Sequence, residues 1–150
     1  MKNNDFLDDL KFHMHKRPDW DSVWMNVADV ISQRSSDPGF RVAAIVVTSD
    51  NTQLLALGYN GDQAGGTNTR ESDVPGESGF IHAEVNALIK LDYNSPKKKI
   101  MYVSMSPCRM CAKAIVNSGI SEVVYREKYR DTSGIEILER AGIRVRQINN

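Results

Sequence analysis

The sequence predicts a three-layer α/β/α fold, in which a central mixed sheet of about five strands lies between helices. Three observations support this prediction. Residues 42–48 form an almost continuous apolar, β-branched run, as in a strand buried on both faces. A second strand, 53–59, is expected after a hairpin turn at Asp50-Asn51. From residue 83 onward helical and strand patterns alternate, so we expect helical crossovers between parallel strands.

The other elements follow from periodicity and from residues that begin or end helices. Residues 19–34 have apolar side chains at helical spacing, with Asp19 or Asp21 as the candidate N-cap. Residues 60–80 contain five glycines and show no regular pattern, and a loop this long inside a domain is usually functional. The later predicted elements are a helix at 83–91, a strand at 99–104, a helix at 108–117, a strand at 122–126, a helix at 133–140 and a strand at 143–148.

Size and composition indicate a single domain over residues 1–150, with a polar N-terminal extension at 1–18. The 19 basic and 19 acidic side chains balance to a formal charge of +0, whereas nucleic-acid-binding proteins usually carry a basic excess. No apolar run approaches the ~20 residues that a membrane span needs. The polar start of the chain lacks the apolar region of a signal peptide. We therefore expect a cytoplasmic protein with no nucleic-acid and no membrane partner.

Two short motifs carry the predicted chemistry, and they are His82-Ala83-Glu84 and Pro107-Cys108-Arg109-Met110-Cys111. Cys108 and Cys111 would share one helix face, and the positive field of a helix N-terminus favours metal-binding thiolates. With His82 they make three protein ligands, which leaves the fourth position of zinc open for water, as in catalytic zinc sites. Glu84 would transfer protons without binding the metal. H-x-E followed by P-C-x-x-C is the pattern of zinc nucleobase deaminases.

The C-x-x-C pair also has simpler interpretations, as half of a structural zinc site or as a redox pair. A structural zinc needs a fourth protein ligand, and the other histidines, His13 and His15, lie in the polar N-terminal segment. A redox pair would leave His82 and Glu84 without a role. The combination of both motifs therefore favours a catalytic zinc.

From Trp24 to Val145 the sequence resembles the deoxycytidylate (dCMP) deaminase family of the zinc-dependent cytidine deaminase superfamily. The zinc motifs are shared by the whole superfamily, whereas Gly58-Tyr59-Asn60-Gly61 and Lys128-Tyr129 point to this family. The other segments that carry the resemblance are Gln33-Arg34-Ser35, residues 42–47, Ala64-Gly65-Gly66, residues 82–88, Met101-Tyr102-Val103, residues 106–113 and Gly119-Ile120.

The resemblance implies a cytidine-deaminase-like fold and the hydrolysis of dCMP to dUMP and ammonia, a reaction that feeds thymidylate synthesis. One Zn²⁺ per chain would be held by His82, Cys108 and Cys111 and would activate water for attack on C4 of cytosine, with Glu84 as the catalytic proton carrier. The substrate-binding residues that it implies are Asn60 for a sugar hydroxyl, Ala83 for the base, and Arg34, Ser35 and Tyr129 for the 5′-phosphate region. A helix end and loop is an equally simple interpretation of the Arg34-Ser35 segment.

Family members of the phage and animal type are homohexamers that dCTP activates and dTTP inhibits, so Gly61 and Gly65 become candidate effector-site residues. Ala43 departs from the family, whose members often have glycine in the first strand. Some phage members hold a second zinc through extra cysteines and histidines, whereas this sequence has Thr67-Asn68-Thr69 and no other cysteine, so one zinc is expected. Two alternatives stay open: a deaminase of another or a modified base, as nucleotide or nucleoside, and a non-catalytic zinc module that binds nucleotides.

Overall fold

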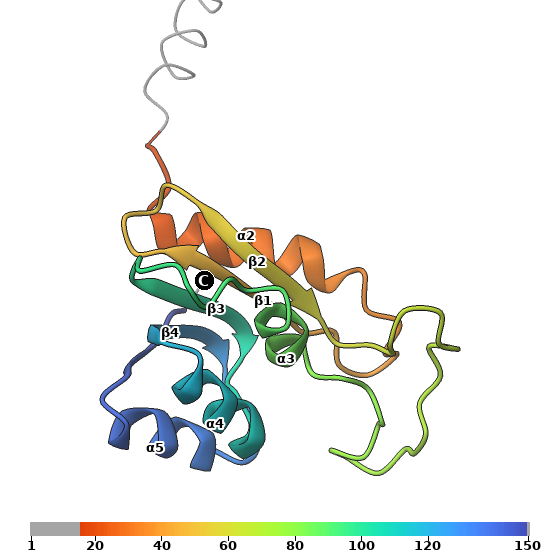
Figure 1. Cartoon of the computed structure of the whole chain (residues 1–150). Coiled ribbons are helices and arrows are strands. Elements are labelled where there is room, and N and C mark those ends of the chain that lie inside the picture. Colours follow the sequence, from red (N-terminus) through yellow and green to blue (C-terminus); the bar gives the residue numbers. More distant parts are fainter. Residues whose placement is uncertain (1–15, 150) are drawn as a thin grey trace, which may run out of the picture.

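Five strands and four helices make up the regular structure of residues 16–149, which the computed structural model describes (Figure 1). Residues 1–15 of the predicted N-terminal extension, with His13 and His15, lie outside the described residues. The strands are β1 (Ala43–Thr48), β2 (Leu54–Tyr59), β3 (Lys99–Met105), β4 (Ile120–Glu127) and β5 (Arg144–Gln147). The helices are α2 (Trp20–Ser32), α3 (Ala83–Leu88), α4 (Arg109–Asn117) and α5 (Ser133–Arg140).

The strands form one mixed sheet in the order β2-β1-β3-β4-β5. β1 pairs antiparallel with both β2 and β3, whereas β3, β4 and β5 run parallel, as the alternating pattern predicts. Helix α2 covers one face of the sheet, and α3, α4 and α5 lie on the opposite face (Figure 1). The predicted three-layer α/β/α fold is therefore confirmed.

Two apolar cores hold the layers together, one on each face of the sheet. All six residues of β1 are buried, because alternate side chains of this inner strand enter the two cores. Ala43 is fully buried in the core on the α2 side. On the opposite side, Ile115 of α4 and Leu138 of α5 are fully buried in the same core as Val103 and Val123 of the parallel strands.

A polar network fixes the start of α2 to the sheet. The side chain of Asp19 caps the helix by accepting a hydrogen bond from Ser22 N at 2.8 Å. Asp21 accepts hydrogen bonds from Tyr102 Oη at 2.7 Å and from Arg146 Nη1 and Nη2 at 2.7 and 3.0 Å, and Arg146 also pairs with Glu122. The Arg146 guanidinium lowers the pKa of Asp21, whereas burial raises the pKa of Tyr102.

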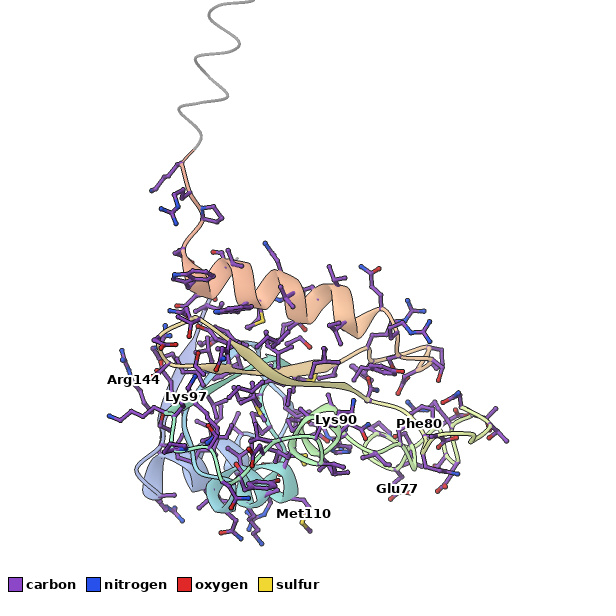
Figure 2. All side chains as sticks on the ribbon, turned by 45° about the horizontal axis from the view of Figure 1, so that its top comes forward. Glu77, Phe80, Lys90, Lys97, Met110 and Arg144 are labelled. Carbon is purple, nitrogen blue, oxygen red and sulfur yellow. The ribbon has the colours of Figure 1, made fainter. Side chains whose placement is uncertain are left out.

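The glycine-rich stretch forms a long irregular loop beside α3, as predicted, and carries Glu77 and Phe80 (Figure 2). Its two ends are joined by an isolated antiparallel bridge, in which Gly61 N donates to Ile81 O at 3.1 Å and Ile81 N donates to Gly61 O at 2.9 Å. Asn86 Nδ2 adds a hydrogen bond to Tyr59 O at 2.8 Å. The end of β2 is therefore fastened to the start of α3, directly before the predicted zinc ligand.

Helix α3 is shorter than predicted, since it ends at Leu88 rather than at Leu91. The amides of Lys90 and Leu91 bond the carbonyls three residues back, at 3.1 Å each, so the chain tightens into a 3₁₀-type turn. No helix of the described residues is both long and apolar enough to cross a membrane.

Candidate metal and active site

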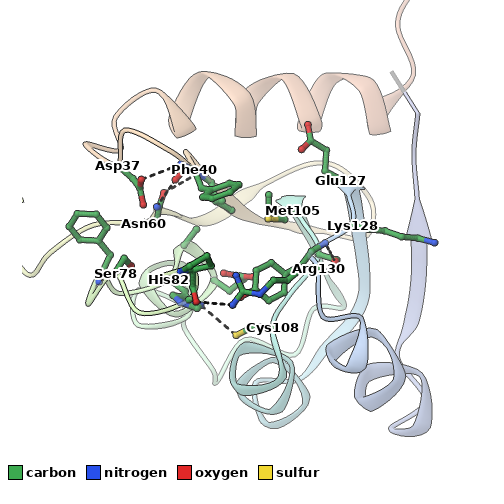
Figure 3. A pocket seen from close by; sticks show the side chains of 18 of the residues that line it. Asp37, Phe40, Asn60, Ser78, His82, Met105, Cys108, Glu127, Lys128 and Arg130 are labelled. Atoms are coloured by element: carbon green, nitrogen blue, oxygen red, sulfur yellow. Dashed lines mark hydrogen bonds between the residues drawn. The ribbon is translucent and has the colours of Figure 1, made fainter. Parts of the chain in front are cut away.

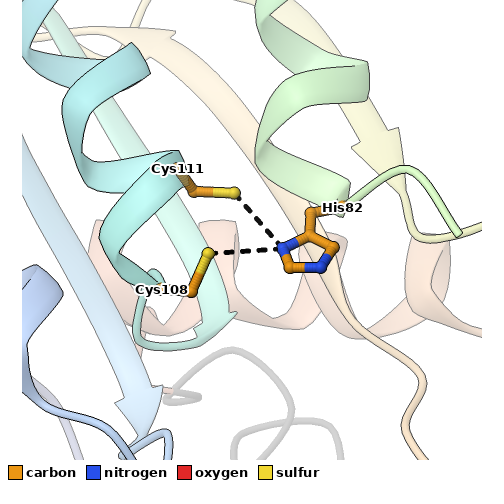
Figure 4. Close-up of side chains that lie close together, drawn as sticks. All are labelled: His82, Cys108 and Cys111. Atoms are coloured by element: carbon orange, nitrogen blue, oxygen red, sulfur yellow. Dashed lines mark hydrogen bonds between the residues drawn. The ribbon is translucent and has the colours of Figure 1, made fainter. Parts of the chain in front are cut away.

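The predicted zinc ligands meet where α3 and α4 begin, close to the carboxyl end of β3 (Figure 4). In α/β sheets this end of the parallel strands is the usual place for a ligand site. His82 is the N-cap of α3 and Cys108 is the N-cap of α4, both with extended backbone, at ψ values of 152° and 171°. Neither side chain makes a capping hydrogen bond, so both remain free for a metal.

The prediction that Cys108 lies inside the helix with Cys111 is wrong in this detail, because α4 begins at Arg109. The extended N-cap still lets the Cys108 thiol approach Cys111 in the first turn (Figure 4). Between the two ligands, Met110 points away from α4 into solvent and is 70% exposed (Figure 2). Cys111 itself is buried, so the first turn of α4 presents its thiol to the protein interior.

The distances within this group suit a single zinc ion. His82 Nδ1 lies 3.5 Å from Cys108 Sγ and 3.4 Å from Cys111 Sγ. Bond lengths of ~2.1 Å to nitrogen and ~2.3 Å to sulfur place those atoms about 3.6 Å apart in a tetrahedral zinc site. The ligand atoms all lie within 4.8 Å of one another, and residues 16–149 contain no other such group of three. Two thiolates and one imidazole form a donor set that zinc prefers.

The two thiols are electrostatically coupled. A hydrogen bond from the Cys111 thiol, opposed by burial and supported by His82, lowers the pKa of Cys108 to about 4. The same bond raises the pKa of Cys111, and the hydrogen bond with Cys108 raises the pKa of His82. The group thus already holds one thiolate at neutral pH, and a metal ion would displace the remaining protons.

Glu84 lies in the first turn of α3 and is only 4% exposed. Burial raises the pKa of its carboxyl above the usual range, with the nearby His82 acting in the opposite direction. A carboxyl with a raised pKa both accepts and donates protons more readily near neutral pH. The structure places Glu84 on the wall of the same cavity as His82 and Cys108.

This cavity has a volume of about 440 Å³, which is within the range of small-molecule sites (Figure 3). Much of its lining is apolar, and its polar groups converge from the long loop, from α3 and from the ends of β3 and β4. The predicted residues that line it are Asn60, His82, Ala83, Glu84, Cys108 and Tyr129. Other lining residues, which the motifs did not identify, include Asp37, Phe40, Arg70, Phe80, Met105, Ser106 and Arg130.

Asn60 holds one wall of the cavity in place. Its Oδ1 accepts a hydrogen bond from Val42 N at 2.9 Å, and its Nδ2 donates to Phe40 O at 2.8 Å (Figure 3). A carboxamide oxygen has two lone pairs, so Oδ1 can accept one further bond. The implied contact with a sugar hydroxyl is compatible with this arrangement and stays a prediction.

The structure does not bring Arg34 or Ser35 to the cavity. Arg34 is exposed where the chain leaves α2, and the hydroxyl of Ser35 accepts a hydrogen bond from Asp37 N at 3.2 Å. The same loop instead contributes Asp37, which is 3% exposed and pairs with Arg70 at 2.8 Å. The interpretation of Arg34 and Ser35 as a helix end and loop therefore describes what the structure shows.

Arg130 and Tyr129 lie at the opposite wall. The guanidinium of Arg130 stacks over the Tyr129 ring at 4.9 Å and donates to Pro75 O of the long loop at 3.1 Å. Tyr129 N donates to Ser106 Oγ at 2.8 Å, and this bond fixes the backbone that carries the Tyr129 ring. Lys128 also lines this wall, but its side chain points away from the cavity (Figure 3).

The two candidate effector residues occupy different surroundings. Gly61 takes part in the bridge to Ile81, whereas Gly65, with φ +82°, lines a second and more polar hollow in the long loop. Arg70 lines both this hollow and the main cavity. Arg70 also pairs with Asp37, which lines the main cavity, so this ion pair connects the polar hollow with the main cavity.

Comparison with known proteins agrees with the site. Residues 18–127 match the family model described as the cytidine and deoxycytidylate deaminase zinc-binding region. Human deoxycytidylate deaminase is 35% identical over 123 residues, which are 76% of this chain and 68% of the human protein. The deoxycytidylate deaminase of Mycobacterium phage D29 is 34% identical over 73% of this chain and 95% of the phage protein. The crystal structure of dCMP deaminase from cyanophage S-TIM5, in complex with dCMP and dUMP, superimposes with a TM-score of 0.77 at 34% identity, covering 89% of this chain and all of that chain.

Proposed function

Because the chain belongs to the cytidine and deoxycytidylate deaminase family, we propose that it hydrolyses dCMP to dUMP and ammonia. One observation carries the proposal: His82 and Cys108, two members of a His/Cys/Cys group that suits zinc, line the same cavity as the buried Glu84. The named relatives and the solved structure are all dCMP deaminases, and the phage structure contains both dCMP and dUMP.

His82, Cys108 and Cys111 would hold the metal, and zinc supplies a Lewis acid that lowers the pKa of a water molecule. Glu84 would take one proton from that water and deliver it to N3 of the cytosine, and would then take the second proton from the oxygen now bonded to C4 and pass it to the amino group as the C4–N bond breaks. The burial of Glu84 supports this role, because a raised carboxyl pKa makes both transfers easier. The same burial disfavours a non-catalytic binding module, since an unused buried carboxylate is costly.

The sugar and base would lie between Asn60 and Ala83. Asn60 Oδ1 would accept the hydrogen of a sugar hydroxyl, and the backbone of Ala83, whose residue is 1% exposed, would contact the base. Phe40 and Phe80 add apolar surface to the cavity. An aromatic and apolar lining with few polar groups is typical of sites for planar heterocycles.

The 5′-phosphate would bind near Tyr129 and Arg130. Arg130 is exposed at the cavity wall, and guanidinium groups bind phosphate oxygens in pairs. Arg130→Met should raise KM for dCMP at least tenfold and leave any activity on deoxycytidine, which has no phosphate, unchanged. Equal effects on both substrates would contradict phosphate recognition by this residue.

The deciding experiment compares the wild-type chain with Glu84→Gln, which keeps the size of the side chain. Ammonia release from dCMP should fall by a factor of about 10³, within the range for loss of a general acid–base group. Zinc content, measured by elemental analysis, should stay at one ion per chain. Normal turnover in the variant would refute the role of Glu84. A zinc-loaded wild-type protein that converts neither dCMP nor deoxycytidine would refute the proposed substrate.

Assembly and regulation are also open to test. We propose a cytoplasmic homohexamer that dCTP activates and dTTP inhibits and whose dUMP enters thymidylate synthesis. The link through Arg70 from the hollow at Gly65 to the cavity supports communication between an effector and the substrate. Native mass spectrometry and dCMP saturation curves with each triphosphate test this part, and a monomer with hyperbolic, effector-insensitive kinetics would contradict it.

A further inference from the structure

Gly134, the second residue of α5, is pressed against the turn that carries the zinc ligand Cys108. A Cβ atom at this position would lie 2.1 Å from Pro107 O and 2.9 Å from Cys108 O. Both neighbours are backbone atoms, so no side chain could rotate away to make room. Even the smallest side chain would displace the backbone of the ligand turn or the start of α5.

Space is the only evident reason for a glycine at this position. Gly134 has no left-handed backbone, unlike Gly119 and Gly142, which follow α4 and α5 with φ values of +79° and +81°. Those two glycines have nothing within 4 Å of an added Cβ. Glycine has a lower helix propensity than alanine, so a glycine within a helix needs a packing reason.

The ligand turn is held from its other sides as well. Ser106 N donates to Glu127 O, and Tyr129 N donates to Ser106 Oγ, each at 2.8 Å. The carbonyl of Cys108 accepts the first intrahelical bond of α4, from Ala112 N at 2.9 Å. The turn therefore cannot yield to a larger residue at position 134 without losing these bonds or moving the thiol.

We propose that Gly134 is a positioning residue for the zinc site. Because Gly134 lets α5 pack directly against the ligand turn, α5 determines the position of the Cys108 thiol relative to His82 and Cys111. The inference rests on the proposed zinc-dependent function but concerns the binding of the metal. Residues that orient metal ligands typically change metal affinity 10- to 100-fold when they are mutated. A group of three protein ligands is sensitive to such a change, because no fourth protein ligand compensates.

The test compares Gly134→Ala with Gly142→Ala, a matched change just beyond the other end of α5. Zinc affinity is measured by competition with a chromophoric chelator, and ligand geometry by the thiolate-to-metal charge-transfer and d–d absorption of the cobalt(II)-loaded proteins. We expect Gly134→Ala to bind zinc at least tenfold more weakly and to shift the cobalt spectrum. Gly142→Ala should lower the melting temperature, because alanine is strained at positive φ, without changing either metal readout. Unchanged zinc affinity and cobalt spectrum in Gly134→Ala would overturn the proposal.

A measurement on the wild-type chain decides the matter if Gly134→Ala does not fold. Hydrogen exchange is followed with and without zinc. If α5 and the ligand turn support each other, zinc removal should speed exchange in α5, at 133–140, more than in α2, at 20–32, which packs on the opposite face of the sheet. Equal changes in both helices would refute the coupling. None of the three readouts depends on deamination, so an inactive wild-type enzyme would refute the proposed substrate and leave this inference standing.

Discussion

Replacing Asp21 with asparagine would remove one negative charge from the network that fastens α2 to the sheet. The carboxylate accepts three hydrogen bonds, one from Tyr102 and two from Arg146, and its side chain is 29% exposed. Tyr102 Oη and Arg146 Nη2 both donate to Oδ1, so the carbonyl oxygen of asparagine can keep these two bonds, whereas the bond from Arg146 Nη1 to Oδ2 and the negative charge are lost. Arg146 would keep its contact with Glu122.

The structure allows an estimate of the loss. Hydrogen bonds to charged groups contribute about 1.5–3 kcal/mol each, and partial exposure together with the remaining Glu122 contact reduces the sum. We therefore expect Asp21→Asn to lower the free energy of unfolding by about 2 kcal/mol. For a chain of this size, that corresponds to about 4–8 °C in melting temperature.

The effect should depend on pH with a definite sign. The Arg146 guanidinium lowers the pKa of Asp21 in the folded protein, so its contribution is complete above the usual carboxyl pKa of about 4. It is lost as the pH falls through the lowered folded pKa, where the carboxylate becomes protonated. The difference in stability between wild type and Asp21→Asn should therefore stay constant from about pH 8 to pH 5 and shrink below about pH 4.

Urea unfolding followed by circular dichroism, repeated across this pH range, measures the difference directly. The exposed Asp73 provides the matched control, since Asp73→Asn should change stability by less than about 0.5 kcal/mol. A loss in Asp21→Asn no larger than that of the control would show that the network contributes little. A difference that grows toward acid pH would contradict the assigned direction of the pKa shift.

Four further tests probe the core and the metal site. Leu138→Ala deletes a fully buried side chain where α5 packs on α4. It should lower the free energy of unfolding, measured by chemical denaturation, by about 3 kcal/mol and leave the zinc content at the wild-type level. Cys111→Ser should leave less than one tenth of the zinc by elemental analysis, and full metal content would show that this thiol is not a ligand. Chelation should lower the melting temperature of wild type but not of Cys111→Ser, because a ligand bound only by the folded state stabilises it. Zinc affinity should rise from pH 6 to pH 8, since the raised pKa values of Cys111 and His82 make proton loss part of binding, and a flat profile would contradict this.

The sequence predicted the features that local patterns encode. The zinc group was identifiable because its ligands lie in two short motifs, each at the start of a helix. The layers of the fold were identifiable because the apolar periodicity changes at each element, and α5 occupies the predicted range of 133–140. The family resemblance named Asn60 and Tyr129, and both line the cavity.

Features that depend on distant pairing were not predictable in the same way. The pair of Asp37 and Arg70 joins two irregular segments that are 33 residues apart, and neither segment has a periodicity that would place it. Arg34 and Ser35 lie only a few residues from Asp37, but the turn after α2 leads the chain so that Asp37 alone of the three reaches the cavity. The tight contact of Gly134 likewise arises only when α5 packs on the ligand turn.

The bridge between Gly61 and Ile81 separates the long loop from the sheet and helices. It closes the base of this loop, so the ends of residues 62–80 stay together whatever the length of the loop. The entropic penalty for closing a loop grows slowly with the number of residues, so insertions and deletions there are inexpensive for folding. The loop contributes Arg70, Pro75 and Phe80 to the lining of the cavity, whereas His82 and Glu84 lie outside the loop. Substrate preference can therefore diverge through exchange of one segment, while the parts that carry out the chemistry keep their geometry.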